Sequence, residues 1–430
     1  MRKTKIIATV GPSLEDYETM KKVFTHANIA RFNFSHGTNQ ERERWLKMLR
    51  EVEQDLNKPI TALADTKGPE VRTQNSEPLP VEKGKEYPIS YLQPAPLDAF
   101  LSVVEEGDIV LVDDGKVIFI YKDGKLKAYN SGIIKPRKSI IIRGKDYPLP
   151  SITPQDKEDI AFINKAGFDV IAQSFVRSPQ DVKEMKSLTS LPVIAKIETA
   201  TSLEHLPQIV EISDGVMVAR GDLALSVPEE EMPLIQKKTI FLAKHYNKPV
   251  IVATQMLSSM VESPFPRRSE IMDIFTAVSH MADALMLSEE TAIGKYPVEA
   301  VSVMSKVAQK AEQEHHFYRP PEADYKDKLA KSAIELAQTF NVPIVAPTGY
   351  GTTPKKLSRQ HPTQPVYAIT PNKSIIPYLN LFYAIYPVEM SYEPVFQNFE
   401  RIKNHLNIDK ALFVFGYPPN NQNTNTLIFI

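Results

Sequence analysis

The sequence contains no cysteine among its 430 residues. This absence excludes disulfide bonds, thiolate metal sites and a cysteine nucleophile, and it fits a reducing compartment. An excess of either charge is also missing, because 51 Lys and Arg residues are balanced by 52 Asp and Glu residues. A balanced net charge predicts no surface for polyanions, so nucleic acids and membrane surfaces are poor candidates for partners.

Long apolar runs are missing too, and no segment is long enough to cross a bilayer. The opening residues MRKTKIIATVGP place basic residues before an apolar run, but that run spans only five residues and no small-residue cleavage site follows it. We therefore expect a first strand there and not a signal peptide. A chain of this length is expected to form two or three domains.

Several common nucleotide-binding and hydrolase motifs are absent. The sequence has no G-x-x-x-x-G-K-[ST] phosphate loop and no G-x-G-x-x-G before a helix, which leaves P-loop NTPases and nicotinamide enzymes unsupported. G-x-S-x-G and H-E-x-x-H do not occur either. Any chemistry must come from residues outside these motifs.

What the chain does have is a regular alternation of apolar runs with amphipathic helical stretches. Eight runs are predicted to be strands: TKIIATVG, IARFNFS, ITALADT, DVIAQSF, PVIAKIE, DGVMVAR, PVIVATQ and ADALMLS. Most are followed by helical patterns such as LEDYETMKKVFTHA. This repeat predicts a closed (β/α)8 barrel.

The alternation breaks twice, and each break predicts a domain limit. After the third strand, short strands separated by turns predict a small β-barrel domain at 72–146, inserted as a lid over the barrel at 1–71 and 147–318. The segment HHFYRPPEADYKDK reads as a linker, in which His315 and His316 are predicted to be solvated and not metal ligands. The alternation then resumes, which predicts a separate open α/β domain at 319–430.

Residues 194–225 carry the most informative pattern. Side chains two apart on a strand point the same way, so Lys196 and Glu198 in VIAKIE share a face. Asp222 closes the next apolar run, and the intervening TATSLEHLPQIVEIS has the spacing of a crossover helix. The three groups are therefore expected to converge. The alternative is a solvated salt bridge at the strand mouth.

Glu198 and Asp222 are two carboxylates without a nearby histidine. Such a pair suits a hard cation held partly by substrate oxygens, such as Mg²⁺ or Mn²⁺, and does not suit zinc. Lys196 beside the ion would offer a compact positive charge to a phosphoryl group in transfer. The pattern thus predicts a metal-assisted site at the barrel mouth.

Other polar residues at strand ends are less specific when taken singly. Alternation places Arg31, Asn33 and Ser35 on one strand face, although Ser35 could equally cap the following helix. Thr254 and Ser288 end the last two barrel strands and could bond either backbone or substrate. A further group, in ADTKGPEVR, comprises Asp65, Thr66, Lys67, Glu70 and Arg72.

Taken in order, these stretches closely resemble the pyruvate kinases along essentially the whole chain. The matching segments are ATVGPS, RFNFSHG, LADTKGPEVRT, VDDGK, KPRKS, SFVR, AKIET, DGVMVARGDL, VATQML and MLSEETAIGKYPVEAV. The resemblance implies transfer of the phosphoryl group of phosphoenolpyruvate to ADP, which yields pyruvate and ATP in the last step of glycolysis. It also implies a cytoplasmic homotetramer with no nucleic-acid or membrane partner.

The resemblance assigns roles by matching motif. Glu198 and Asp222 would hold Mg²⁺ or Mn²⁺, Lys196 would stabilise the phosphoryl group, and Arg31 would bind the phosphate. The backbone from Ala219 to Asp222, including Gly221, would receive the substrate carboxylate, with Ser288 also at the substrate. Thr254 would be a catalytic residue beside it, near the face where the enolate takes its proton. The remaining roles fall to the K⁺ ligands Asn33, Ser35, Asp65 and Thr66, and to the nucleotide-pocket residues Arg72 and Lys138. Glu70 suggests K⁺ dependence, because K⁺-independent relatives tend to carry lysine there.

Some positions depart from the family pattern. Ala224 and Ser226 replace a glycine and a glutamate, and Glu289 stands where glycine is usual. Further departures are Gln74, Phe265, Arg267 and the segment KSIIIRG in the insert. These departures could change nucleotide affinity, subunit packing and lid closure. None of them replaces Lys196 or either of the two metal ligands.

The C-terminal domain also departs from the family at its effector-phosphate loop. The loop TGYGTT keeps Thr348, Gly351 and Thr353 but has Tyr350 and Thr352 in place of a serine and a basic residue. The later loop GYPPNNQNTNT lacks an arginine or lysine. We therefore expect weak or absent activation by fructose 1,6-bisphosphate.

Two alternative functions stay open on sequence alone. One is a metal-dependent lyase or aldolase that acts on a 2-oxo acid at the same carboxylate pair. The other is a catalytically weakened relative that senses phosphorylated metabolites. Lys138 and Lys196 argue against the first, and the retention of Lys196 and both metal ligands argues against the second.

Overall fold

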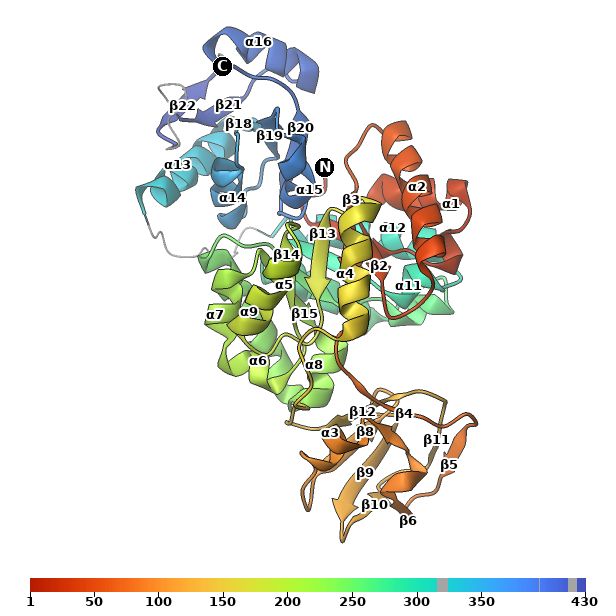
Figure 1. Ribbon diagram of the computed structural model, residues 1–430. Helices are drawn as coiled ribbons and strands as arrows, with labels where there is room; N and C mark the ends of the chain where they lie inside the picture. Colours follow the sequence, from red (N-terminus) through yellow and green to blue (C-terminus); the bar gives the residue numbers. More distant parts are fainter. Residues whose placement is uncertain (315–323, 394, 417–423) are drawn as a thin grey trace.

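The computed structural model describes residues 1–314, 324–393, 395–416 and 424–430. Eight parallel strands within the first of these ranges close into a barrel, in the order β1-β17-β16-β15-β14-β13-β3-β2 (Figure 1). Their bounds are β1 Lys5–Thr9, β2 Ile29–Asn33, β3 Thr61–Asp65, β13 Val170–Gln173, β14 Val193–Ile197, β15 Gly215–Ala219, β16 Val250–Ala253 and β17 Ala284–Leu287. Nearly all of these residues are buried, as expected for parallel strands covered on both faces. The predicted barrel is confirmed.

Helices follow the strands and pack around the outside of the barrel (Figure 1). The longer ones are α1 Tyr17–His26, α2 Asn39–Asp55, α4 Pro154–Ala166, α5 Pro179–Leu188, α9 Met232–His245, α10 Arg268–Ser279 and α12 Pro297–Ala311. Local sequence explains their ends: α4 starts after Thr153, whose hydroxyl accepts a hydrogen bond from the Asp156 amide at 3.1 Å, and stops at Gly167, where φ is 94°.

One predicted helix differs in the structure. The stretch TATSLEHLPQIVEIS forms two short helices, α6 Ala200–Glu204 and α7 Leu206–Ile212. Pro207 is the physical reason, because proline lacks the amide hydrogen of a helix interior and is tolerated in the first turn of a new helix. The two short helices together still form the crossover that connects the parallel strands β14 and β15.

The insert is antiparallel β structure at the end of the barrel where β3 stops (Figure 1). Residues 71–142, all described, form a seven-stranded sheet in the order β6-β10-β9-β8-β12-β4-β7 and a two-stranded sheet of β11 and β5. The bounds are β4 Val71–Thr73, β5 Leu79–Val81, β6 Glu86–Pro88, β7 Pro94–Ala95, β8 Ile109–Val112, β9 Val117–Lys122, β10 Lys125–Ala128, β11 Gly132–Ile134 and β12 Ser139–Ile142, with α3 Leu97–Leu101. Its own apolar core includes Phe100, Phe119 and Ile140.

The C-terminal part is an α/β unit at the opposite end of the barrel from the insert (Figure 1). Its described residues form a sheet in the order β20-β19-β18-β21-β22, in which β22 is antiparallel to β21. The elements are α13 Tyr325–Phe340, β18 Ile344–Pro347, α14 Thr352–Arg359, β19 Val366–Thr370, α15 Ile376–Leu379, β20 Ile385–Glu389, α16 Val395–Leu406, β21 Leu412–Phe415 and β22 Thr426–Phe429. The predicted open α/β fold is confirmed, whereas the limits of all three domains stay a prediction.

The amino-terminal end of the barrel and the C-terminal unit share one apolar core. Ile7 and Leu63 of the barrel belong to the same buried cluster as Leu381 and Phe382. Polar contacts reinforce the junction, since the Tyr383 amide donates to Asp283 Oδ1 at 2.9 Å. The opposite end of the barrel, which faces the insert, is left open for a site.

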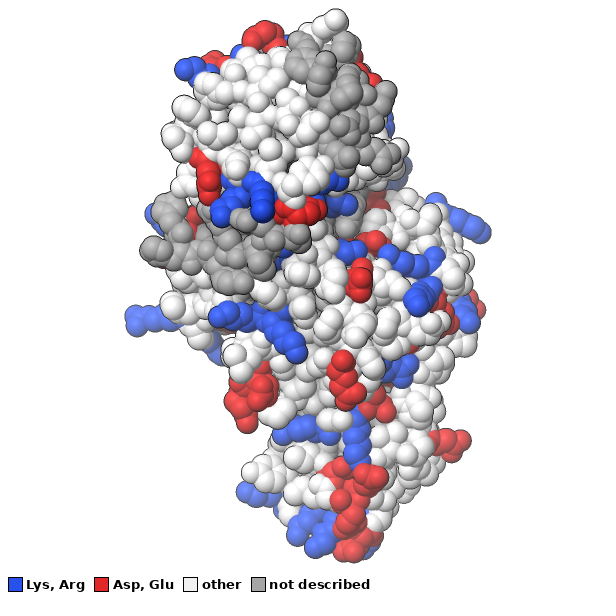
Figure 2. Space-filling model, turned by 90° about the vertical axis from the view of Figure 1, so that its left-hand side faces the viewer, with Lys and Arg blue, Asp and Glu red and all other residues white. Residues whose placement is uncertain are grey.

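The surface and the remaining segments add little to the functional argument. Positive and negative side chains are interspersed on the face shown in Figure 2, in agreement with the balanced composition. No helix in the described part of the chain is both long and apolar enough to span a bilayer. The predicted linker residues His315 and His316 lie outside the described residues.

Candidate active site

Lys196 stands at the carboxyl end of β14, inside the mouth of the barrel. Its Nζ lies 2.8 Å from Glu198 Oε1, as the shared strand face predicted, and 3.0 Å from Asp65 Oδ1. Lys196 is 8% exposed and Glu198 is 1% exposed, so the pair is not a solvated salt bridge. Burial alone would lower the pKa of Lys196, but the Asp65 and Glu198 carboxylates outweigh it and raise the pKa above its usual value. The ammonium group therefore stays charged.

The turn after β13 supplies two contacts that sequence reasoning missed. The Ser174 hydroxyl accepts a hydrogen bond from Lys196 Nζ at 2.7 Å, and the Phe175 amide donates to Glu198 Oε2 at 2.8 Å. The segment SFVR belongs to the motifs that carry the family resemblance, but its pattern does not specify a partner for Lys196. A polar residue at the end of a buried strand was the only signal present.

Asp65 links two strands of the mouth. Its Oδ2 accepts from Arg31 Nε at 2.7 Å, while its Oδ1 faces Lys196. Burial would raise the pKa of this fully buried carboxyl, but the charges of Lys196 and Arg31 hold the pKa below its usual value. Arg31 also donates to Thr9 Oγ1 at 3.1 Å, so its guanidinium is fixed at the mouth.

Asp222 comes from a helix and not from a strand end, which corrects the prediction. Helix α8 (Arg220–Ser226) begins directly after β15, and Asp222 lies in its first turn. Burial and the neighbouring Glu198 carboxylate raise the pKa of Asp222 to about 7. No described residue donates a hydrogen bond to this carboxylate. The two carboxylates repel each other, so a cation between them would be bound favourably.

Thr254 and Gly221 contact each other beside the Glu198 and Asp222 carboxylates. Thr254 adopts a φ of 68°, an unusual conformation for a β-branched residue and one that clusters at functional sites. Its Oγ1 donates to the Ala253 carbonyl at 2.6 Å and accepts from the Gly221 amide at 2.7 Å. The backbone-bonding alternative thus holds for Thr254, although the residue also lines the cleft. Ser288 differs, because its buried Oγ has no hydrogen-bond partner among the described residues.

The predicted monovalent-cation ligands lie at the ends of the neighbouring strands β2 and β3 or directly after them. Asn33 of β2 pairs in register with Asp65 of β3. Asn33 Oδ1 accepts from the Ser35 amide at 3.0 Å, and the Thr66 carbonyl accepts from Ser174 Oγ at 2.6 Å. Ser35 lies beyond the end of β2 and does not cap the next helix.

Thr38 caps that helix. Its hydroxyl accepts from the Glu41 amide at 3.3 Å, and Glu41 Oε2 accepts from the Thr38 amide at 2.7 Å. This reciprocal pair satisfies two amides at the start of α2. The alternative role considered for Ser35 is therefore wrong.

Of the predicted nucleotide-pocket residues, Arg72 lies in β4, the first strand of the insert, and Lys138 directly precedes β12, its last strand. Arg72 donates to Glu70 Oε2 at 2.7 Å and to the Arg137 carbonyl at 2.9 Å. Lys138 Nζ lies 3.1 Å from Asp113 Oδ1. The Glu70 carboxylate is therefore paired with Arg72, and Glu70 lies at the junction of the barrel and the insert.

One cleft of about 580 Å³ gathers most of these side chains. It lies between the barrel mouth and the insert, and its predicted members are Arg31, Asn33, Ser35, Arg72, Lys138, Lys196, Glu198, Asp222, Thr254 and Ser288. Asp65, Thr66 and Gly221 stand behind this lining and reach it through the contacts given above. Its size suits a small-molecule site.

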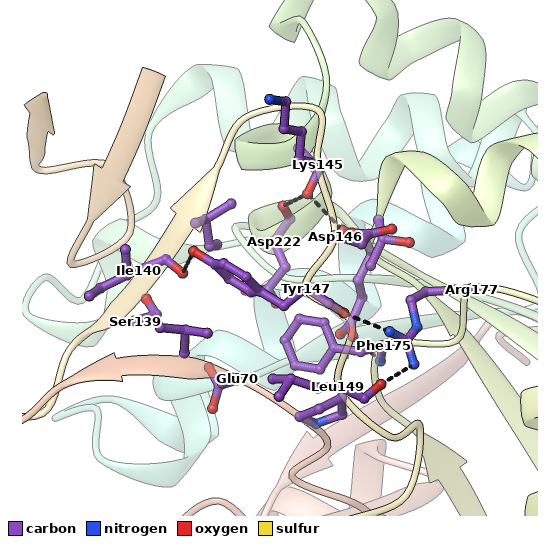
Figure 3. Close-up of a pocket in the computed structure, with 16 residues that line it drawn as sticks. Glu70, Ser139, Ile140, Lys145, Asp146, Tyr147, Leu149, Phe175, Arg177 and Asp222 are labelled. Atoms are coloured by element: carbon purple, nitrogen blue, oxygen red, sulfur yellow. Dashed lines mark hydrogen bonds between the residues drawn. The ribbon is translucent and has the colours of Figure 1, made fainter. Parts of the chain in front are cut away.

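A second, smaller pocket of about 50 Å³ marks the hinge between insert and barrel. Figure 3 shows Arg177 beside the returning chain, where it donates to the carbonyls of Tyr147 at 2.8 Å and Leu149 at 2.7 Å. The Tyr147 hydroxyl donates to the Ile140 carbonyl at 3.0 Å. The return of the chain from the insert is therefore held against the barrel.

Three of the residues that depart from the family pattern lie in the barrel. Ser226 ends α8, where its carbonyl accepts from the Gly144 amide of the insert at 3.1 Å. Glu289 lines the large cleft and adds a negative charge to it. Arg267 precedes α10, and its amide donates to Glu270 Oε2 at 2.8 Å. None of them displaces Lys196, Glu198 or Asp222.

The loop predicted for an effector phosphate is compact. The Gly351 amide donates to Thr348 Oγ1 at 2.8 Å, and Gly351 has a φ of 78°, which favours glycine. Tyr350 is 74% exposed at its tip. Most of the second loop, 417–423, lies outside the described residues, so the effector expectation stays a prediction.

Comparisons with known proteins agree with this geometry. The family profile "Pyruvate kinase, barrel domain" matches residues 1–301, and "Pyruvate kinase, alpha/beta domain" matches residues 327–427. The pyruvate kinase of Thermotoga maritima is 37% identical over 90% of this chain and 89% of its own length. That of Aeropyrum pernix is 35% identical over 86% of this chain and 85% of its own.

A solved structure supports the same assignment. The crystal structure of pyruvate kinase from Pyrobaculum aerophilum superposes with a TM-score of 0.89 at 29% identity, and the match covers 100% of this chain and 99% of the other. The barrel, the insert and the C-terminal unit are therefore shared and not only the site. The chain belongs to the pyruvate kinase family.

Proposed function

We propose that the large cleft transfers the phosphoryl group of phosphoenolpyruvate to ADP, with Lys196 as the residue that stabilises the group in transfer. The observation that carries this proposal is the buried Lys196 ammonium, held between Asp65 and Glu198 in a cleft that also contains Arg31. Transfer of a phosphoryl group needs positioning and neutralisation of charge more than covalent chemistry by the protein. A lysine that stays charged when buried meets that need.

The carboxylates of Glu198 and Asp222 are suited to hold a divalent cation. The Asp222 carboxylate accepts no hydrogen bond from the described residues, and burial together with repulsion by Glu198 raises its pKa. Oxygen donors without sulfur or imidazole favour Mg²⁺ or Mn²⁺. When bound, such an ion neutralises charge on the oxygens of the substrate. Three or more His, Asp or Glu residues do not cluster as a metal site anywhere in the described chain, so substrate oxygens would complete the coordination.

The remaining cleft residues bind and orient the substrate. Arg31 can donate to the phosphate, because its guanidinium is fixed by Asp65 and Thr9. Thr254 orients the Gly221 amide, and this part of α8 would receive the substrate carboxylate. Ser288 Oγ is buried without a hydrogen-bond partner among the described residues, so it could bond to the substrate or to an ordered water.

Oxygen atoms at the ends of β2 and β3 would bind K⁺. They belong to Asn33, Ser35, Asp65 and the Thr66 carbonyl, which the register of the two strands brings together. K⁺ dependence is supported by the family and by Glu70.

The insert would act as the lid over the bound nucleotide. Arg72 and Lys138 line the cleft from the insert, so they would contact ADP phosphates. A lid that excludes water protects a reaction that forms ATP. The homotetrameric state and a cytoplasmic location remain parts of this proposal.

The test is formation of pyruvate from phosphoenolpyruvate and ADP with Mg²⁺, with and without K⁺. We expect K⁺-stimulated turnover, and we expect Lys196→Met to lose activity by about a hundredfold or more, as removal of one preorganised charge contact does. Thermal unfolding of Lys196→Met serves as the control for folding. The reaction assignment fails if wild-type enzyme forms no pyruvate under any cation, and the role of Lys196 fails if Lys196→Met keeps full turnover.

A metabolite-sensing role without catalysis gains no support from the structure or the relatives. Lys196, Glu198 and Asp222 are all present and lie in one cleft. A lyase of the same barrel type would have no use for Arg72 and Lys138 at the insert. Phosphoryl transfer is therefore the function we propose.

A further inference from the structure

The turn that follows β13 contacts two functional side chains of the neighbouring strand at once. Ser174 Oγ lies 2.7 Å from Lys196 Nζ, and the Phe175 amide lies 2.8 Å from Glu198 Oε2. Neither Ser174 nor Phe175 has a role in the function proposed above. Because β13 and β14 pair in parallel, their ends meet at the same edge of the barrel.

The Ser174 hydroxyl is held in one orientation. It is buried, with 2% exposure, and its single proton goes to the Thr66 carbonyl at 2.6 Å, which is much nearer than the other acceptor, Asp65 Oδ1, at 3.4 Å. The Ser174 amide donates in turn to Thr66 Oγ1 at 3.2 Å. With its proton committed, the hydroxyl can only present a lone pair to Lys196.

Ser174 also differs in kind from the other partners of Lys196. An ammonium group has three N–H donors, and here they face Asp65, Glu198 and Ser174. Asp65 and Glu198 are charged and keep the lysine protonated, whereas Ser174 is neutral and chiefly sets direction. Loss of Ser174 would thus leave the charge balance intact and change where Nζ lies.

The backbone of the turn is shaped for these contacts. Phe175 adopts a φ of 52°, which is uncommon for a residue with a large side chain and strains the backbone there. Gly68 packs against the turn with a φ of 71°, and a Cβ there would lie 2.9 Å from Ser174 Cβ. A strained backbone over a glycine is a feature of functional sites more than of ordinary strand ends.

We propose that Ser174 is a positioning residue that holds the Lys196 ammonium at the point in the cleft where the phosphoryl group passes. The proposal rests on the assignment of Lys196 to phosphoryl transfer. It does not make Ser174 a catalytic residue, because its hydroxyl acts through Lys196. A purely structural serine would affect folding and not the rate of transfer.

Ser174→Ala is the direct test, and Ser202→Ala is its matched control. Ser202 is also fully buried, and its hydroxyl donates to a backbone carbonyl, that of Thr199, at the same 2.6 Å. Ser202 follows the adjacent strand and does not line the cleft. We expect the two variants to lose similar thermal stability, while only Ser174→Ala loses kcat.

The expected loss of kcat in Ser174→Ala is about tenfold to a hundredfold, with the KM for phosphoenolpyruvate changed much less, because a displaced catalytic group affects the reaction more than binding. Ser174→Cys keeps a weak acceptor of similar shape and should recover part of the kcat. Equal kcat in Ser174→Ala and Ser202→Ala would overturn the proposal, as would a loss confined to KM.

A second readout separates this proposal from the proposed function. Amine-labelling of the intact protein, followed by peptide mapping, reports the reactivity of Lys196 without any turnover. We expect faster labelling of Lys196 in Ser174→Ala than in wild type or Ser202→Ala, because one of its three contacts is gone. Unchanged labelling would contradict the positioning role even in a protein that formed no pyruvate.

Discussion

Gly68, which packs against the Ser174 turn, shows at the residue scale how little space the site leaves. A Cβ on Gly68 would lie 2.8 Å from Phe175 Cδ2 and 2.9 Å from Ser174 Cβ, distances at which something must move. Gly84 has a similar positive φ of 83°, but a Cβ there would meet nothing within 4 Å. An alanine at Gly84 would therefore add backbone strain alone, whereas an alanine at Gly68 would add both backbone strain and overpacking.

This pair yields a prediction for stability. Gly84→Ala should lower the free energy of unfolding by about 1 kcal/mol through its left-handed backbone. Gly68→Ala should lower it by about 1–3 kcal/mol more, because overpacking is added. It should also lower kcat, since the Ser174 turn must shift. Urea unfolding and the pyruvate assay check both, and equal stability of the two variants would contradict the packing argument.

At the element scale, the short segment between β2 and α2 contains two hydroxyl residues with different roles, one at the cleft and one at the start of the helix. Thr38 forms the reciprocal cap with Glu41. Ser35 instead lines the cleft, and its amide donates a hydrogen bond to Asn33 Oδ1. Both are hydroxyl residues that precede the same helix. Only the path of the chain through the turn decides which one caps it.

The two residues should respond differently to truncation. Thr38→Ala should lower the free energy of unfolding by about 1 kcal/mol, the usual effect of a lost N-cap, and leave the K⁺ activation of turnover in place. Ser35→Ala should show the reverse, with weaker K⁺ activation and little change in stability. Chemical unfolding together with K⁺ titration of activity tests the pair. If Ser35→Ala proves to be the less stable variant, the division of tasks is wrong.

The junction between barrel and C-terminal unit buries charge at the scale of the whole molecule. Lys5 is 1% exposed, its Nζ donates to the Ile385 carbonyl, and the group lies 4.5 Å from the centre of the Tyr386 ring. Burial, helped by the positive charges of Arg2 and Lys58, lowers the pKa of Lys5 to about 7. Folding therefore favours the neutral amine at this junction.

The sign of the resulting pH dependence follows from linkage. Between the folded pKa of about 7 and the unfolded value of about 10.4, the unfolded chain binds a proton at Lys5 that the folded chain lacks, so the free energy of unfolding rises with pH. Lys5 contributes at most about 5 kcal/mol to this rise. We expect Lys5→Met to flatten the rise in urea unfolding between about pH 7 and pH 10.

The exposed Lys47 of α2 provides the control for this experiment. Lys47→Met should keep the wild-type pH dependence. The pKa of Lys58 is lowered to about 7 as well, chiefly by burial, so some rise should persist in Lys5→Met. A slope identical to that of wild type would show that Lys5 is charged in the folded protein.

The sequence by itself determined the architecture and most members of the site. Buried parallel strands read as continuous apolar runs, and strand alternation requires Lys196 and Glu198 to share a face, so both follow from local pattern. The order of motifs along the chain identified the family, which the comparisons confirm. These features depend on the periodicity and the types of residues that are close together in the sequence, so they can be predicted without a structure.

Only the tertiary structure decided which groups hold the site in place. Ser174 reaches Lys196 from the end of the neighbouring strand, and Asp65 bridges Arg31 and Lys196. Asp222 was predicted at the end of a strand and not in a helix, because the apolar run does not show where β15 ends and α8 begins. Contacts between distant segments depend on strand register and turn geometry, which no local pattern of residues encodes.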